Sequence, residues 1–159
     1  MTLLVQSGRT AIAQALSEQP LHLAWGIGDG AWATPPAEDA AATALISEVG
    51  RRQIVDVGYV VPDVAGLIVL ASGSFTLSGT PTKYLYLKTV FDFADAQSSV
   101  IREIAVFSGS TMVGGLPGGQ QYFVPAEVAT PGRMVSLQHL VPIYRSPAIR
   151  ENFEIVIQF

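Results

Sequence analysis

The sequence contains no cysteine among its 159 residues. This absence excludes thiolate zinc sites, a cysteine nucleophile and a disulfide framework, and it leaves the redox compartment open. Histidine is nearly absent too, since His22 and His139 are the only two, and a lone histidine beside apolar neighbours is more often structural than a general base. A chain of this length can bury a sizeable core in one domain, so its stability requires neither disulfides nor a metal.

Charge is scarce. Charged residues make up only 14% of the sequence, whereas hydrophobic residues make up 49%. Nine basic and thirteen acidic residues give a net charge of −4, which provides no basic surface for DNA or RNA, so we expect no nucleic-acid partner. Two explanations fit the excess of apolar residues: a surface that a protein partner covers, and a large β core. We expect the protein to self-associate or to co-assemble with other proteins.

Long hydrophobic runs are also missing. The longest, residues 64–71, is interrupted by Gly66 and falls far short of the ~20 apolar residues that span a bilayer. The opening residues, Met1-Thr-Leu-Leu-Val-Gln, lack the basic start and the long apolar core of a signal peptide. We therefore expect no membrane insertion and no Sec export.

Hydrophobic periodicity predicts an α+β fold, with two short N-terminal helices packed on a mainly antiparallel β-sheet or sandwich. The first helix runs to about Glu18 and is capped by Ser7. The second is capped by Thr34 and stopped by Gly50. Its expected buried stripe consists of Ala41, Ala42, Leu45, Ile46 and Val49.

The rest of the chain has the period of two that is typical of strands. We expect a single domain, with a helix–strand–helix entry over residues 1–50 and a mainly β part over residues 51–159. The predicted strands are 21–27, 55–61, 66–71, 74–78, 84–93, 99–107, 120–124, 134–144 and 152–159. The glycine-rich segment 108–121 is either a hairpin connection or a partner-binding loop.

Glycines cluster where the strand 21–27 ends, in Gly26-Ile-Gly-Asp-Gly30. Their spacing is G-x-G-x-G rather than the G-x-G-x-x-G of dinucleotide sites, and no helix start follows directly. A turn is therefore favoured over a phosphate site, with glycines that supply positive φ and with Asp29 bonding backbone amides.

An adjacent pair of charges, Arg102 and Glu103, lies inside an otherwise apolar strand. The two side chains point to opposite faces of a regular strand. Because Glu103 shares its face with apolar residues, we expect its carboxylate to be buried, with Arg51 or Arg52 as its cationic partner. The alternative places both charges on an exposed strand edge, where they oppose aggregation.

Catalytic patterns are not found. The motifs H-x-x-x-H, H-E-x-x-H and G-x-S-x-G do not occur, and Asp92 and Asp95 resemble a polar hairpin loop more than a pair of catalytic carboxylates. We expect no enzymatic activity, no catalytic or metal-binding residues and no cofactor. An aromatic platform for sugars remains an alternative, built from Tyr84, Tyr86, Tyr122, Trp25 and Trp32.

Three motifs follow one another along the chain: Gly28-Asp29-Gly30, then Leu45 with Glu48 and a basic residue after it, then Ile101-Arg-Glu-Ile104. In order and separation they resemble the N-terminal domain of phage tail-fibre and tail-collar proteins over about residues 5–110. The resemblance implies a virion structural protein that docks a fibre or an adaptor on the tail or baseplate, usually as an oligomer and without catalytic residues. The structural or interface candidates are Gly28, Asp29, Gly30, Glu48, Arg51, Arg52, Arg102 and Glu103.

The sequence departs from that family at Ala105, where a glycine is usual, and no long fibre shaft follows. Both departures favour a short adaptor or baseplate protein over a complete fibre. Its expected partners are other tail, baseplate or fibre proteins and further copies of itself. Its expected location is the virion tail, after assembly in the host cytoplasm. The alternative function is a carbohydrate-binding module for host surface glycans.

Overall fold

The computed structural model describes every residue from Met1 to Phe159, and the chain divides into two compact units. Unit 1 comprises Met1–Gln19, Ile54–Thr89 and Phe153–Phe159. Unit 2 comprises Pro20–Gln53 and Val90–Asn152. Each unit is therefore assembled from segments that lie far apart in the sequence.

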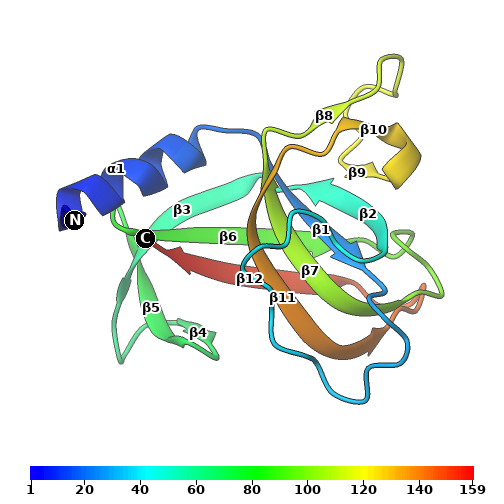
Figure 1. Cartoon of the computed structure of the whole chain (residues 1–159), viewed down its shortest axis with the longest axis horizontal. Coiled ribbons are helices and arrows are strands. Elements are labelled where there is room, and N and C mark those ends of the chain that lie inside the picture. The colour runs from blue at the N-terminus through cyan, green and yellow to red at the C-terminus, as the bar shows by residue number, and fades with distance from the viewer. The chain divides into compact units, whose positions relative to one another are not determined.

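Unit 1 contains one α-helix and most of a five-stranded sheet with the order β12-β6-β3-β5-β4 (Figure 1). Strand β3 pairs antiparallel with both β5 and β6, and β4 pairs antiparallel with β5. The elements are α1 (Gln6–Ser17), β3 (Asp56–Pro62), β4 (Ile68–Leu70), β5 (Gly73–Ser78), β6 (Tyr84–Phe91) and β12 (Glu151–Gln158).

Helix α1 confirms the first predicted helix, but not its cap. The N-cap residue is Val5 rather than Ser7, and no side chain caps the helix. Ala13 is fully buried, and the hydroxyl of Ser17 lies 2.7 Å from the hydroxyl of Tyr59 in β3. The end of the helix is thus tied to the sheet by a hydrogen bond.

The core of unit 1 forms around Val60, Phe75 and Tyr86. Tyr84 packs against this cluster, with its ring centroid 6.1 Å from that of Phe75. Tyr84 and Tyr86 therefore contribute to core packing, as alternating aromatic residues on a strand often do.

Unit 2 contains a second five-stranded sheet with the order β11-β7-β1-β2-β9, together with a two-stranded ribbon of β8 and β10 (Figure 1). Strand β7 pairs antiparallel with β1 and β11, and β1 pairs antiparallel with β2. The elements are β1 (Leu21–Gly26), β2 (Glu48–Gln53), β7 (Val100–Ser108), β8 (Thr111–Met112), β9 (Tyr122–Phe123), the 3-10 helix η1 (Pro125–Glu127), β10 (Val128–Thr130) and β11 (Arg133–Tyr144).

The central strands of unit 2, β1 and β7, supply its core. Ala24 and Phe107 form a buried cluster with Leu45, against which Met134 and Leu137 of β11 pack. Strand β7 lies between β11 and β1, so both of its edges are paired, and its side chains Ile101 and Val106 are fully buried.

The prediction of a second N-terminal helix is wrong, and with it the α+β class with two helices. Residues 27–47 form an irregular segment, called here the 27–47 loop, and Glu48–Gln53 form strand β2. Leu45 is the one large apolar residue of the predicted stripe that is buried, whereas Ile46 is 64% exposed. The spacing of apolar residues in this segment is typical of a helix. The residues around Gly50 nevertheless form a strand that pairs with β1, because tertiary pairing overrides local propensity. The fold is mainly β with one short α-helix.

Candidate functional site

Glu103 in β7 anchors the 27–47 loop. Its side chain is 1% exposed. Its Oε1 accepts the N–H of Gly28 at 3.3 Å and the N–H of Ser47 at 3.0 Å, while Oε2 accepts the N–H of Ile46 at 3.2 Å. One carboxylate therefore holds backbone from both ends of the loop.

The expected burial of Glu103 is confirmed, but the expected partner is wrong. Neither Arg51 nor Arg52 pairs with it. Three backbone N–H groups supply the hydrogen bonds instead, and such donors stabilise a carboxylate without a neighbouring cation. The three motifs that carry the family resemblance are therefore in contact. The Gly28-Asp29-Gly30 turn and the residues after Leu45 both bind β7, the strand that contains Arg102 and Glu103.

Glycine is required at two positions beside this carboxylate. Gly28 has a φ of +57°, and a Cβ there would lie 2.6 Å from Cζ3 of Trp32. A Cβ on Gly26 would lie 2.5 Å from Oε1 of Glu103. Asp29 Oδ1 accepts the N–H of Ala31 at 2.8 Å, which confirms the predicted Asx-type turn. The turn therefore depends on Gly28 and Asp29.

Arg102 points to the opposite face from Glu103, as expected from strand alternation. Its Nη1 donates to the carbonyl oxygen of Ile27 at 3.2 Å and to that of Val100 at 3.4 Å. Its Nε is buried without a hydrogen-bond partner. Both residues of the charged pair thus contact the start of the 27–47 loop.

Glu48 and Arg51 form a second polar cluster. Arg51 is 2% exposed and binds the Glu48 carboxylate with two hydrogen bonds, of 2.8 and 2.7 Å. Its Nη1 also donates to the Ser110 hydroxyl and to the Pro131 carbonyl oxygen, each at 2.7 Å. The guanidinium lies 4.4 Å from the centroid of the Phe107 ring. Such a bidentate, charge-assisted pair is geometrically specific, and here it fixes β2 against the start of the glycine-rich segment.

Arg52 forms a third cluster with the 92–99 loop, which connects β6 and β7. Its Nη1 lies 2.7 Å from Oδ2 of Asp95, and the same oxygen accepts the N–H of Asp92 at 2.7 Å. Asp92 itself pairs with Arg150 at the surface. The segment is a polar loop, as expected from the sequence, but it is not a hairpin, because the strands that it joins, β6 and β7, lie in different sheets.

Arg145 is a buried residue that the sequence analysis missed. Its Nη2 donates to the Asp92 carbonyl oxygen at 2.7 Å, and its Nη1 donates to the Ile149 carbonyl oxygen at 3.0 Å. The guanidinium lies 5.0 Å from the centroid of the Trp25 ring. A single arginine after a long strand carries no local signal that would have indicated this role.

The middle of the 27–47 loop is held against β11. Glu38 Oε1 accepts the N–H of His139 at 3.0 Å, and this hydrogen bond lowers the pKa of the Glu38 carboxyl below its usual value. Nδ1 of His139 lies 2.9 Å from the carbonyl oxygen of Pro36. The rings of Trp32 and His139 are 4.6 Å apart between centroids. The loop is thus tied to the sheet at its centre as well as at its ends.

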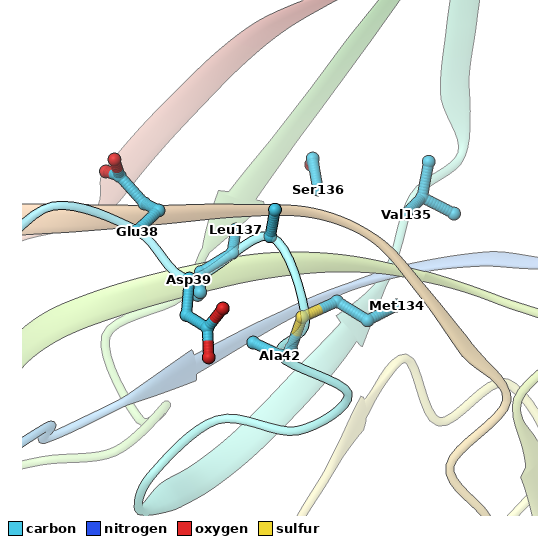
Figure 2. Close-up of a pocket in the computed structure, with 8 residues that line it drawn as sticks. Glu38, Asp39, Ala42, Met134, Val135, Ser136 and Leu137 are labelled. Atoms are coloured by element: carbon cyan, nitrogen blue, oxygen red, sulfur yellow. The ribbon is translucent and has the colours of Figure 1, made fainter.

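A shallow cavity of about 250 Å³ lies between the loop and β11 (Figure 2). In Figure 2, Ala42 and Met134 lie close together, and the carboxylates of Glu38 and Asp39 point away from each other. The lining residues are Glu38, Asp39, Ala40, Ala42, Met134, Val135, Ser136 and Leu137. Small-molecule pockets usually enclose about 300–1,000 Å³ with convergent polar groups, so this cavity is smaller than most of them.

The structure brings the candidate residues together in three groups rather than in one. Glu103 binds Gly28 and Arg102 binds the neighbouring Ile27, Glu48 pairs with Arg51, and Arg52 pairs with Asp95. A Cβ on Gly30 would meet no heavy atom within 4 Å.

No helix of the structure is long and apolar enough to cross a membrane. No group of three or more acidic or histidine side chains is arranged to hold a metal ion. The candidate site consists of backbone, apolar side chains and a few carboxylates that accept backbone hydrogen bonds.

Comparison with known proteins gave one family match. A family model described as "Baseplate wedge 3 tail fiber network component" matches residues 1–159. No curated protein matches the sequence.

Proposed function

Since the chain belongs to the baseplate wedge 3 tail fiber network component family, we propose that this structural protein of the phage tail works as an adaptor that docks fibre or other baseplate proteins. The family assignment confirms the tail-protein resemblance indicated by the sequence motifs. It also confirms the virion structural role, with other tail proteins as partners. We further propose that docking uses a defined surface, that it involves neither catalysis nor a cofactor, and that each assembly contains more than one copy.

The proposal rests on the 27–47 loop, which is exposed to solvent and yet held in place by hydrogen bonds. Long irregular segments inside compact proteins are either functional or disordered. This loop is exposed over most of residues 31–44, yet its backbone is bound by Glu103 at both ends and by contacts of Glu38 with His139 at its centre. A loop of fixed shape on a sheet is a common way to present a binding surface.

The cavity beside the loop supports a protein partner. Ala40, Ala42 and Met134 give it apolar surface, and Glu38 and Asp39 lie beside them. An apolar anchor in a small pocket with polar groups at the rim is the usual arrangement of an interface hot spot. We therefore place the docking surface on the loop and the adjoining part of β11.

The structure does not favour glycan binding through the aromatic platform. Trp25 is fully buried and Tyr86 is 6% exposed. Tyr122 lies against Trp25, whose Nε1 donates to its hydroxyl at 3.2 Å. Of the platform residues, only Trp32 lies on the exposed loop, so no stacked aromatic surface is formed.

The test is binding of the purified protein to the other baseplate and fibre proteins of the same phage, measured for two matched variants. Ala40→Arg adds a bulky charge at the cavity, whereas Ala94→Arg adds the same group to an exposed position of the 92–99 loop. We expect Ala40→Arg to weaken binding at least about tenfold, equivalent to about 1.4 kcal/mol, with an unchanged melting temperature. Ala94→Arg should bind as the wild type does. Equal binding by both variants, or binding to a glycan array without binding to any tail protein, would contradict the proposal.

A further inference from the structure

The proposed docking surface carries an excess of negative charge. The 27–47 loop contains three acidic residues, Asp29, Glu38 and Asp39, and no lysine or arginine. All three are exposed. The loop therefore has a formal charge of −3, whereas the whole chain has a net charge of −4. The charge of the protein is thus concentrated on the loop that we assign to docking.

No lysine or arginine of the chain pairs with these loop carboxylates. The ion pairs of the structure use other acidic residues, namely Glu48, Asp92, Asp95, Glu151 and Glu154. Arg133, which precedes Met134 at the cavity, forms no ion pair with Glu38 or Asp39. The hydrogen bond from the N–H of His139 lowers the pKa of the Glu38 carboxyl, so this group stays ionised at neutral pH. The negative charge is therefore free to meet a cation of a partner.

Both carboxylates at the cavity are held in place by backbone hydrogen bonds. Glu38 is bound to the N–H of His139, and Oδ1 of Asp39 accepts the N–H of Ala41 at 2.8 Å. Oδ2 of Asp39 accepts no hydrogen bond within the chain. In Figure 2 the two carboxylates point away from each other, so they do not converge on one metal ion. They offer two separate anionic contacts on either side of the cavity instead.

The cavity itself has an apolar lining beside these charges. Ala40, Ala42, Met134 and Leu137 contribute to it, and its volume is about 250 Å³. Lysine and arginine combine the same two properties, since their aliphatic stems pack on apolar surface while their charged ends stay accessible. A stem lying on Ala42 and Met134 would bring its charged end to the carboxylate side of the cavity. A neutral apolar side chain would use only the lining, and an acidic one would be repelled.

We propose that the docking surface binds a basic segment of another tail protein, whose lysine or arginine side chains lie on the cavity lining and pair with Glu38 and Asp39. This inference rests on the proposed function and names the chemistry of the partner. Complementary charge of this kind accelerates association and disfavours partners of the wrong sign. The loop therefore selects its partner by charge as well as by shape.

The experiment measures the association rate of the full chain with the tail protein that binds it, at increasing salt concentration. Salt shortens the Debye length from about 10 Å at 0.1 M to about 3 Å at 1 M, so the wild-type rate should fall at least about tenfold over this range. Asp39→Asn removes the charge but keeps an oxygen for the N–H of Ala41, and it should lower the rate about two- to fivefold at low salt. Asp39→Lys reverses the charge and should lower it at least about tenfold.

Asp56→Asn is the matched control, because Asp56 is an exposed aspartate of unit 1 that lies outside the loop. It should bind as the wild type does. A charge exchange then identifies the contact: replacing the basic residue of the partner by glutamate should weaken binding to the wild type and restore binding to Asp39→Lys. Since Asp39 and Asp56 are both exposed, the melting temperatures of all variants should stay unchanged.

Binding that Ala40→Arg weakens, but that neither salt nor Asp39→Lys affects, would overturn the basic partner and leave the docking proposal standing. Equal losses for Asp39→Asn and Asp56→Asn would reveal a general charge effect and overturn the inference too. Salt-dependent self-association that Asp39→Lys abolishes, without binding to another tail protein, would assign the cation to a second copy of this chain. A wild type that binds no tail protein and does not self-associate would contradict the docking proposal and the inference together.

Discussion

The carboxylate of Glu103 accepts the backbone N–H of Ser47 at 3.0 Å, across 56 positions of the sequence. The same group holds Gly28 and Ile46, so a single side chain in β7 determines where the 27–47 loop leaves the sheet and where it returns. The proposed docking surface therefore depends on a residue that is itself buried and that a partner would not touch.

Replacing Glu103 by alanine should leave three backbone N–H groups without an acceptor. Each buried unsatisfied donor costs about 1–3 kcal/mol, and partial solvent access to the loop ends reduces the sum, so we expect a loss of about 3 kcal/mol in the free energy of unfolding. Hydrogen exchange should accelerate over residues 27–47. Glu103→Gln keeps the volume and one acceptor and should lose less. An unchanged denaturant midpoint for Glu103→Ala would show that the carboxylate does not hold the loop.

Two glycines of the same turn should respond differently to alanine. Gly28→Ala forces a left-handed backbone conformation, which costs about 1–2 kcal/mol, and its Cβ meets the ring of Trp32. Gly30→Ala meets nothing within 4 Å and has no positive φ, so its stability should stay within about 0.5 kcal/mol of the wild type. Thermal melts of the two variants provide the comparison, and equal losses would contradict the positions of these glycines in the turn.

The buried pair of Arg51 and Glu48 should matter far more than the exposed pair of Arg150 and Asp92. Arg51→Met leaves the Glu48 carboxylate, whose side chain is 18% exposed, without its cation and should cost up to about 3–5 kcal/mol. Arg150→Met breaks a pair whose side chains are 57% and 42% exposed, and it should cost far less because solvent screens exposed pairs. A double variant, Arg51→Met with Glu48→Met, should recover part of the loss. Denaturant unfolding measures all three, and similar losses for both single variants would refute the ranking.

Stability should fall below neutral pH because of His22. Burial, with a smaller contribution from the charge of Arg51, lowers the pKa of His22 to about 4. His22 takes up a proton near pH 6.5 in the unfolded chain but only near pH 4 in the folded protein. The free energy of unfolding should therefore decrease by up to about 3 kcal/mol as the pH falls through that window. His22→Phe keeps an aromatic ring beside Phe123 and removes the proton site. Its stability should therefore vary less between pH 6.5 and 4; the same slope in both proteins would exclude His22 as the cause.

Alternation of apolar and polar residues was enough to predict most of the strands. Each of the predicted strands has an observed counterpart, and the burial of Glu103 followed from its place between Ile101 and Phe107 on one face of β7. The turn at Gly28 and Asp29 was also predicted correctly. These features depend on neighbours within a few positions, where backbone geometry determines which side chains share a face.

Tertiary structure alone decided the rest. Residues 34–50 have the composition of an amphipathic helix, but Gly50 pairs with Trp25 in a sheet. The residues before this strand form a loop that is hydrogen-bonded to Glu103 and His139. The partner of Glu103 could not be predicted for the same reason, since a buried carboxylate requires donors but its own sequence does not specify which ones. Local pattern determines that a group is buried; only the long-range pairing of strands determines which donors and acceptors reach it.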